Sequence, residues 1–158
     1  MNKLIIRKVL EIEPNSYNSM VDWMYHWWGA DEGYSLDEVK CYMAHSLNDV
    51  RFPQTYGLFL DNEIIGMYQF TYSDLDIRPD IYPWLANVFI REDYRGNGYM
   101  KLLIDSAKEN AVKSGLTELY LFTEHIGLYE KYGFVFAEEI DTFKKTPRIQ
   151  RLYRLNLS

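Results

Sequence analysis

The organisation of this chain is decided by one stretch, Trp84-Leu85-Ala86-Asn87-Val88-Phe89-Ile90-Arg91-Glu92-Asp93-Tyr94-Arg95-Gly96-Asn97-Gly98-Tyr99-Met100. Its beginning, Trp84 to Ile90, is aromatic and β-branched, which predicts a strand through the core. A basic loop with two glycines follows. From Met100 to Lys113, apolar residues recur at three- and four-residue offsets, which predicts an amphipathic helix. Gly115 stands where a helix C-terminus favours a left-handed residue.

The loop between this strand and this helix has the features of an anion site. The first-turn N–H groups of a helix are unpaired, and the helix dipole favours negative charge beside them. Gly96 and Gly98 let a phosphate approach the backbone closely, and Arg95 adds a fixed positive charge. The loop therefore indicates a pyrophosphate site. The alternative is an ordinary strand–loop–helix connection with turn glycines.

Two motifs resemble the GNAT superfamily of acyl-CoA-dependent N-acyltransferases. Arg95-x-x-Gly98 resembles the family's Gln/Arg-x-x-Gly-x-Gly/Ala loop for the coenzyme A pyrophosphate, although Met100 stands where the family usually has Gly or Ala. Some thirty residues downstream, Leu128 to Phe134 (Leu-Tyr-Glu-Lys-Tyr-Gly-Phe) is similar to the second signature, a short helix ending in Gly-Phe. Because both motifs occur in this order, the chain is identified as a member of the superfamily.

Composition fits one domain, residues 1–158, with 47% apolar residues, too many for a disordered chain. Lys and Arg total 17 against 23 acidic residues, a net charge of −6, which argues against a nucleic-acid partner. The lone Cys41 provides neither a disulfide nor a metal framework, so no metal is expected. There is no apolar run of about 18 residues and no signal-peptide core. We expect a cytoplasmic protein without a membrane partner, as a monomer or homodimer.

The other predicted elements follow the family's order. Leu4–Val9 is a first strand, Ser16 caps a first helix, and Ser35-Leu36-Asp37-Glu38 is a capping box for a second helix. The inward stripe of that second helix is Leu36, Val39, Met43 and Leu47. Asp61-Asn62 predicts a hairpin between Thr55–Leu60 and Ile64–Tyr72. A fifth strand over Leu119–Thr123, a short helix over Ile126–Tyr132 and a final strand pair over Phe134–Glu138 and Arg148–Leu155 complete the chain.

The fold class implied is mixed α/β, the GNAT fold. Its central sheet is mixed and largely antiparallel, with about six or seven strands and helices on both faces. The resemblance further implies that the central strand splays from its neighbour. The backbone of Val88, Phe89 and Ile90 would then bind the pantetheine arm of acetyl-CoA, the expected co-substrate, and a backbone N–H there would stabilise the developing oxyanion. The loop residues implied to bind the pyrophosphate are Arg95, Gly96, Asn97, Gly98, Tyr99, Met100 and Lys101. The alternative for the strand is a purely structural role in the core.

Tyr129 matches the tyrosine that serves many family members as general acid toward the coenzyme A sulfur, and a phenol is protonated at neutral pH. The alternative is a packing role. The general base is open among Glu124 and His125 after the fifth strand, Asp76 and Asp80 in the loop before the central strand, and a water chain. The alternative for each of these side chains is a solvated loop residue.

The aromatic cluster Tyr25-His26-Trp27-Trp28 is expected near the acceptor, because the family places its first two helices there. Trp27, Trp28 and Asp76 are the candidate acceptor-binding residues, and aromatic faces can hold an ammonium group; core packing is the alternative. The function implied is acetyl transfer from acetyl-CoA to a primary amine, on a small molecule or a peptide, by direct attack. A covalent route through Cys41 is disfavoured, because Cys41 lies far in sequence from the coenzyme loop. The alternative function is a non-catalytic acyl-CoA sensor or interaction module.

Overall fold

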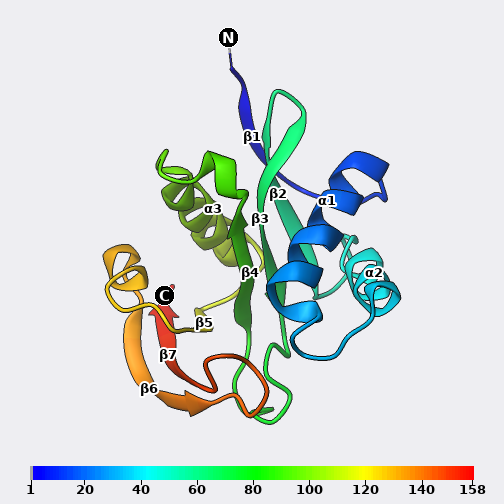
Figure 1. Ribbon diagram of the computed structural model, residues 1–158. Coiled ribbons are helices and arrows are strands. Elements are labelled where there is room, and N and C mark those ends of the chain that lie inside the picture. Colours follow the sequence, from blue (N-terminus) through cyan, green and yellow to red (C-terminus); the bar gives the residue numbers. More distant parts are fainter. Residues whose placement is uncertain (1) are drawn as a thin grey trace.

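The computed structural model describes residues 2–158 and contains one seven-stranded sheet in the order β1-β2-β3-β4-β5-β7-β6 (Figure 1). The β4–β5 pair is parallel and the other five neighbouring pairs are antiparallel, which confirms the mixed, largely antiparallel sheet. The strands are β1 (Leu4–Lys8), β2 (Gln54–Leu60), β3 (Glu63–Thr71), β4 (Trp84–Ile90), β5 (Glu118–Thr123), β6 (Val135–Asp141) and β7 (Ile149–Asn156).

Helices cover both faces of the sheet, as predicted (Figure 1). On one face lie α1 (Pro14–Met24), a π-helical turn η1 (Tyr25–Gly29) and α2 (Leu36–His45). The buried Met20 and Met24 of α1 and Met43 of α2 pack against Phe59 and Met67 of the sheet. The other face is covered by α3 (Tyr99–Lys113). Two single turns, η2 (Glu92–Tyr94) and η3 (Tyr129–Tyr132), complete the elements. No helix within residues 2–158 is long and apolar enough to cross a membrane.

The structure confirms the predictions that depend on strong local signals. β4 has the predicted bounds, and α3 begins one residue before Met100 and ends at Lys113. Gly115 has a φ of +82°, as a left-handed residue after a helix requires. Asp61 and Asn62 have φ values of 49° and 70° and join β2 to β3. Ser35 and Glu38 form the reciprocal capping box, with N···O distances of 3.1 and 2.9 Å.

Four local predictions were wrong. Glu13, not Ser16, caps α1: its carboxylate accepts from the N–H groups of Asn15 and Ser16, and Pro14 takes the first helical position. Leu36 is 43% exposed, because it lies in the first turn of α2, outside the packed stripe. The short helix over 126–132 is reduced to the turn η3, since Gly127 is left-handed, and β6 continues beyond Glu138 to Asp141.

Two irregularities of β4 determine where the sheet opens. Within the described residues, the β4–β5 ladder consists of the pair Trp84↔Tyr120, after which the two strands separate. On its other edge, β4 pairs Ala86 with Gln69 and Phe89 with Met67, so two residues of β4, Asn87 and Val88, stand opposite one residue of β3. This is a β-bulge, and Asn87 in it has a left-handed φ of 51°.

Candidate functional site

A cleft of about 700 Å³ opens where β4 and β5 separate. It is bounded by η1 and the loop after it, by β4, by the start of α3, by the end of β5, by η3 and by the loop between β6 and β7. Segments from the N-terminal, central and C-terminal parts of the sequence therefore line one cleft. The expected splaying of the central strand is present.

The N-terminal end of α3 forms one end of this cleft. Gly96 and Gly98 have φ values of +83° and +79°, and Gly98 is the N-cap residue, with no side-chain cap. The first-turn N–H groups of α3 therefore have no capping side chain. Arg95 and Met100 line the cleft, and Arg95 is fixed by a 2.8 Å hydrogen bond from its Nε to the carbonyl of Ile90.

The other residues of the predicted loop have different surroundings. Gly96, Asn97 and Gly98 are exposed beside the cleft, and Tyr99 is half-buried. Lys101 forms an ion pair with Asp105 at 2.6 Å, four residues along α3. On β4, Val88 and Phe89 line the cleft, whereas Ile90 is buried outside its lining. Four of the ten predicted coenzyme residues thus line the cleft, namely Val88, Phe89, Arg95 and Met100.

Tyr129 lies in the wall of the cleft and is 8% exposed. Its ring packs edge-to-face on Phe134 with centroids 5.8 Å apart, and burial raises its pKa to about 12. The turn that carries it is anchored at Glu130, whose carboxylate accepts from the N–H of Gly127 at 3.0 Å and from the hydroxyl of Tyr153 at 3.0 Å. The phenol is therefore held in place and stays protonated at neutral pH.

The lining of the cleft also combines aromatic walls with acidic side chains. Trp23, Trp27 and Trp28 line it, and Trp27 is 48% exposed. Five carboxyl-bearing residues belong to the lining, against Lys145 and Arg95 as the basic residues; the acids are Asp22, Asp31, Glu32, Asp74 and Glu124. This excess of negative charge favours a cationic ligand.

In two of these acids, Glu32 and Asp74, burial disfavours the ionised carboxylate. Glu32 Oε2 is inaccessible to solvent and has no hydrogen-bond partner within residues 2–158. Burial raises the pKa of Glu32, an effect that Lys145 opposes. Burial also raises the pKa of Asp74, again against an opposing effect of Lys145. A further positive charge placed between these carboxyl groups would stabilise their ionised forms.

The candidate bases divide into two groups. Glu124 and His125 are exposed and line the cleft. Asp76 and Asp80 lie outside its lining. Asp76 accepts from the hydroxyl of Ser73 at 2.6 Å, and Asp80 pairs with Arg78 at 3.0 Å. Cys41 is likewise not among the cleft residues.

Sequence reasoning missed Glu32, Asp74 and Asn87. Acidic loop residues such as Glu32 and Asp74 carry no local signal, since exposed loops are normally rich in them. For Asn87 a signal existed: asparagine is depleted in strands, yet it interrupts an apolar one. Within residues 2–158, no group of three or more His, Cys, Asp or Glu side chains is placed to hold a metal ion.

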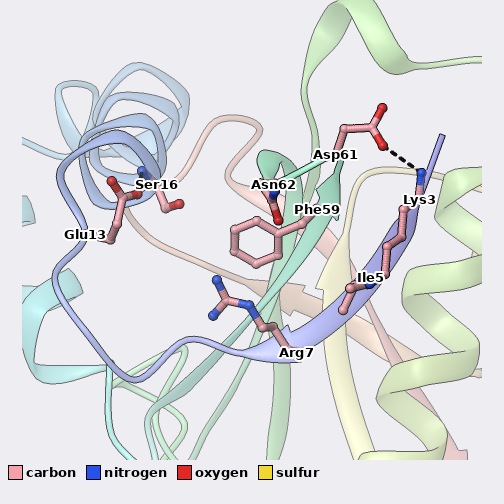
Figure 2. A pocket seen from close by; sticks show the side chains of 8 residues that line it. All are labelled: Lys3, Ile5, Arg7, Glu13, Ser16, Phe59, Asp61 and Asn62. Carbon is pink, nitrogen blue, oxygen red and sulfur yellow. Dashed lines mark hydrogen bonds between the residues drawn. The ribbon is translucent and has the colours of Figure 1, made fainter. Parts of the chain in front are cut away.

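A second hollow, of about 620 Å³, lies between β1, the tip of the β2–β3 hairpin and the start of α1 (Figure 2). The side chains of three of its four charged residues, Arg7, Glu13 and Asp61, already have structural partners. Asp61 accepts from the backbone N–H of Lys3 at 2.8 Å, the Arg7 guanidinium stacks on Phe59 at 4.1 Å, and Glu13 caps α1. This hollow is therefore a poorer candidate than the cleft between β4 and β5.

Comparison with known proteins shows the family to which the chain belongs. Residues 17–134 match the model of the acetyltransferase (GNAT) family. No curated protein matches the chain. Among solved structures, the fold is similar to a GNAT family acetyltransferase from Elizabethkingia anophelis with acetyl-CoA bound, at 19% identity and a TM-score of 0.70, covering 98% of each chain.

Two further structures show the same fold. Aminoglycoside 6'-acetyltransferase type Ii has a TM-score of 0.74 at 14% identity, covering 98% of this chain and 97% of that one. The acetyltransferase of GNAT family from Streptococcus pneumoniae has a TM-score of 0.69 at 20% identity, covering 99% of this chain and all of that one. Since the family model spans most of the sequence, the chain belongs to the GNAT acetyltransferase family.

Proposed function

We propose that this protein transfers the acetyl group of acetyl-CoA to a primary amine by direct attack. The observation that carries the proposal is the cleft at the β4–β5 opening, which brings the uncapped start of α3, the buried Tyr129 and an acid-lined aromatic wall to one place. Acetyl-CoA bound in the Elizabethkingia structure of the same fold supports the choice of acyl donor.

The α3 end of the cleft suits the pyrophosphate of the donor. Two left-handed glycines present backbone N–H groups without side chains in front of them, and an ideal Cβ at either position would meet nothing within 4 Å. The guanidinium of Arg95 supplies positive charge beside these groups. Met100 leaves the backbone contact possible, because its side chain packs on the core cluster beneath α3.

In the proposed reaction the amine nitrogen attacks the thioester carbonyl carbon, a C–N bond forms and the C–S bond breaks. A backbone N–H of the β4 bulge stabilises the carbonyl oxygen as it gains charge. The hydroxyl of Tyr129 donates to the departing sulfur. The amine loses its proton to Glu124, to His125 or to water in the open cleft.

The acidic side chains in the lining of the cleft support a cationic acceptor. A protonated amine is attracted by the carboxyl groups of Glu32 and Asp74, and the faces of Trp27 and Trp28 can contact its cationic portion. The aminoglycoside acetyltransferase of the same fold is named for an acceptor with several amino groups. These features favour acceptors that carry more than one positive charge.

The direct test follows free thiol release from acetyl-CoA with 1,4-diaminobutane, hexylamine, kanamycin and a lysine-containing peptide as separate acceptors. We expect amine-dependent release, and acetylated product by mass spectrometry, with 1,4-diaminobutane or kanamycin ahead of hexylamine. Release that is equal with and without amine would contradict acetyl transfer to these amines. Binding of acetyl-CoA without any release would favour the acyl-CoA sensor.

A further inference from the structure

The β4 bulge leaves a short piece of backbone without ladder partners. Asn87 and Val88 are skipped in the pairing with β3, and β5 has already separated from β4 at this level. Both residues line the cleft. The backbone next to the reacting centre is therefore not positioned by the sheet, and something else must fix it.

The side chain of Asn87 provides that fixation. Its Nδ2 donates to Oε1 of Gln69 at 2.6 Å, and its Oδ1 accepts from Nε1 of Trp28 at 3.1 Å. Asn87 also has a φ of 51°, a left-handed conformation that asparagine tolerates better than most residues. The amide thus links the bulge to β3 on one side and to the acceptor wall on the other.

Gln69 holds this link in one orientation. It is fully buried, its Nε2 donates to the hydroxyls of Thr55 at 2.9 Å and Ser46 at 3.2 Å, and its Oε1 also accepts from the hydroxyl of Tyr42 at 3.0 Å. With the nitrogen of Gln69 directed at Thr55, its oxygen must face Asn87. At the other end, the indole of Trp28 can only donate, so Asn87 must present its oxygen there.

We propose that Asn87 is a positioning residue for acetyl transfer, which sets the backbone of the β4 bulge against the thioester and couples it to Trp28 in the acceptor wall. The inference rests on the proposed acetyl transfer for its kinetic consequence. The network Gln69–Asn87–Trp28 joins β3, β4 and η1 through one amide. Displacing the bulge would misalign the thioester with any group that stabilises its oxyanion, and small misplacements cost catalysis heavily.

The decisive variant is Asn87→Gly, because glycine accepts the left-handed backbone while the amide is lost. Its matched control is Asn62→Gly, in the exposed β2–β3 turn, where asparagine also has a positive φ, of 70°, and no side-chain hydrogen bond within the described residues. Trp28→Phe keeps an aromatic ring in the wall and removes the donor to Asn87, together with part of the indole that packs on Tyr34 and Tyr42. All three are made in the full chain.

The first measurement does not depend on turnover. In ¹⁵N-labelled protein, the indole N–H resonance of Trp28 is assigned by its loss in Trp28→Phe. We expect Asn87→Gly to move this resonance toward a solvent-exposed position and Asn62→Gly to leave it in place. An unmoved resonance in Asn87→Gly would overturn the proposed coupling, even if no amine of the panel is acetylated.

The second measurement is acetyl transfer to the best amine of that panel. Asn87→Gly should lower kcat by about tenfold to a hundredfold, with the KM for acetyl-CoA within about threefold of wild type. Trp28→Phe should lower kcat in the same direction, and the double variant should lose less than the product of the two losses, since both break one chain. A wild-type kcat in Asn87→Gly, or fully multiplicative losses, would overturn the inference. Absence of turnover in wild type would instead count against the proposed function.

Discussion

The phenol of Tyr129 is constrained by its burial. Its pKa of about 12 keeps the hydroxyl protonated at neutral pH. An ordinary thiol has a pKa of about 8.5, so complete transfer of the phenol proton to a thiolate would be uphill by about 3.5 pKa units, or about 5 kcal/mol. Tyr129 is therefore suited to donating a hydrogen bond to the departing sulfur, with solvent supplying the final proton.

Replacing Tyr129 by phenylalanine removes this donor and keeps the ring that packs on Phe134. We expect kcat to fall by about tenfold, at the lower end of the effects of general acids, with little change in acetyl-CoA binding. The measurement is single-turnover acetyl transfer at saturating acetyl-CoA. Tyr132→Phe is the control, since Tyr132 lies in the same turn but outside the cleft lining. A wild-type rate in Tyr129→Phe would remove the hydroxyl from the mechanism.

At the scale of elements, α3 has a left-handed glycine beside each end. Gly98 at its start and Gly115 after its end have φ values of +79° and +82°, and neither has a neighbour within 4 Å of an ideal Cβ. A β-branched residue at either site is strained by the backbone conformation and not by a clash. The two glycines therefore differ in function only through their positions, and they form a matched pair.

We expect acetyl-CoA to raise the Tm of the wild-type protein by mass-action linkage. At a hundredfold excess over Kd, binding increases the free energy of unfolding by about 2.7 kcal/mol. Gly98→Val should abolish this rise, because it distorts the N–H groups proposed to bind the pyrophosphate. Gly115→Val should lower the Tm of the free protein to a similar extent and keep the rise. The readout is thermal unfolding with and without acetyl-CoA. An undiminished rise in Gly98→Val would place the coenzyme elsewhere.

Elements with strong local signals could be predicted from the sequence. β4 is an apolar run interrupted by Asn87, α3 has a clear helical period between two glycines, and the Asp61-Asn62 turn has its own conformational preference. The π-helical turn η1 could not be predicted, because its aromatic residues fit an α-helix equally well. The bulge at Asn87 depends on partners in β3 and η1, which the local sequence of β4 does not contain.

At the scale of the whole molecule, some residues of the cleft could be predicted from the sequence and others could not. The order of two motifs indicated the family, and the family's fold placed Arg95 and Tyr129 in one cleft. The acidic wall could not be predicted, since Glu32 and Asp74, together with the Lys145 that opposes their charge, come from three separate loops. Asp74 lines the cleft and the predicted Asp76, two residues further along the same loop, does not.

Buried tyrosines also give the whole molecule a specific response to alkaline pH. Tyr68 is fully buried and Tyr129 is 8% exposed, and burial raises the pKa of each, to about 12 for Tyr129. In the unfolded chain a tyrosine titrates near pH 10. Above that pH the unfolded chain loses phenolic protons that the folded protein keeps. The free energy of unfolding must then decrease as pH rises, by up to about 1.4 kcal/mol per pH unit for each such tyrosine.

We therefore expect stability to be unaffected by these phenols below about pH 10 and to fall between about pH 10 and 12. Tyr68→Phe should reduce stability at neutral pH by about 1 kcal/mol, because Tyr68 shares hydrogen bonds with Ser106 at 2.9 Å and Asn110 at 2.9 Å. The same variant should show a shallower alkaline decline, since one buried phenol no longer has to ionise on unfolding. Tyr72→Phe is the control, because Tyr72 is 57% exposed. Urea unfolding at a series of pH values, with tyrosinate absorbance recorded in parallel, measures both effects, and equal slopes in Tyr68→Phe and wild type would contradict the assignment.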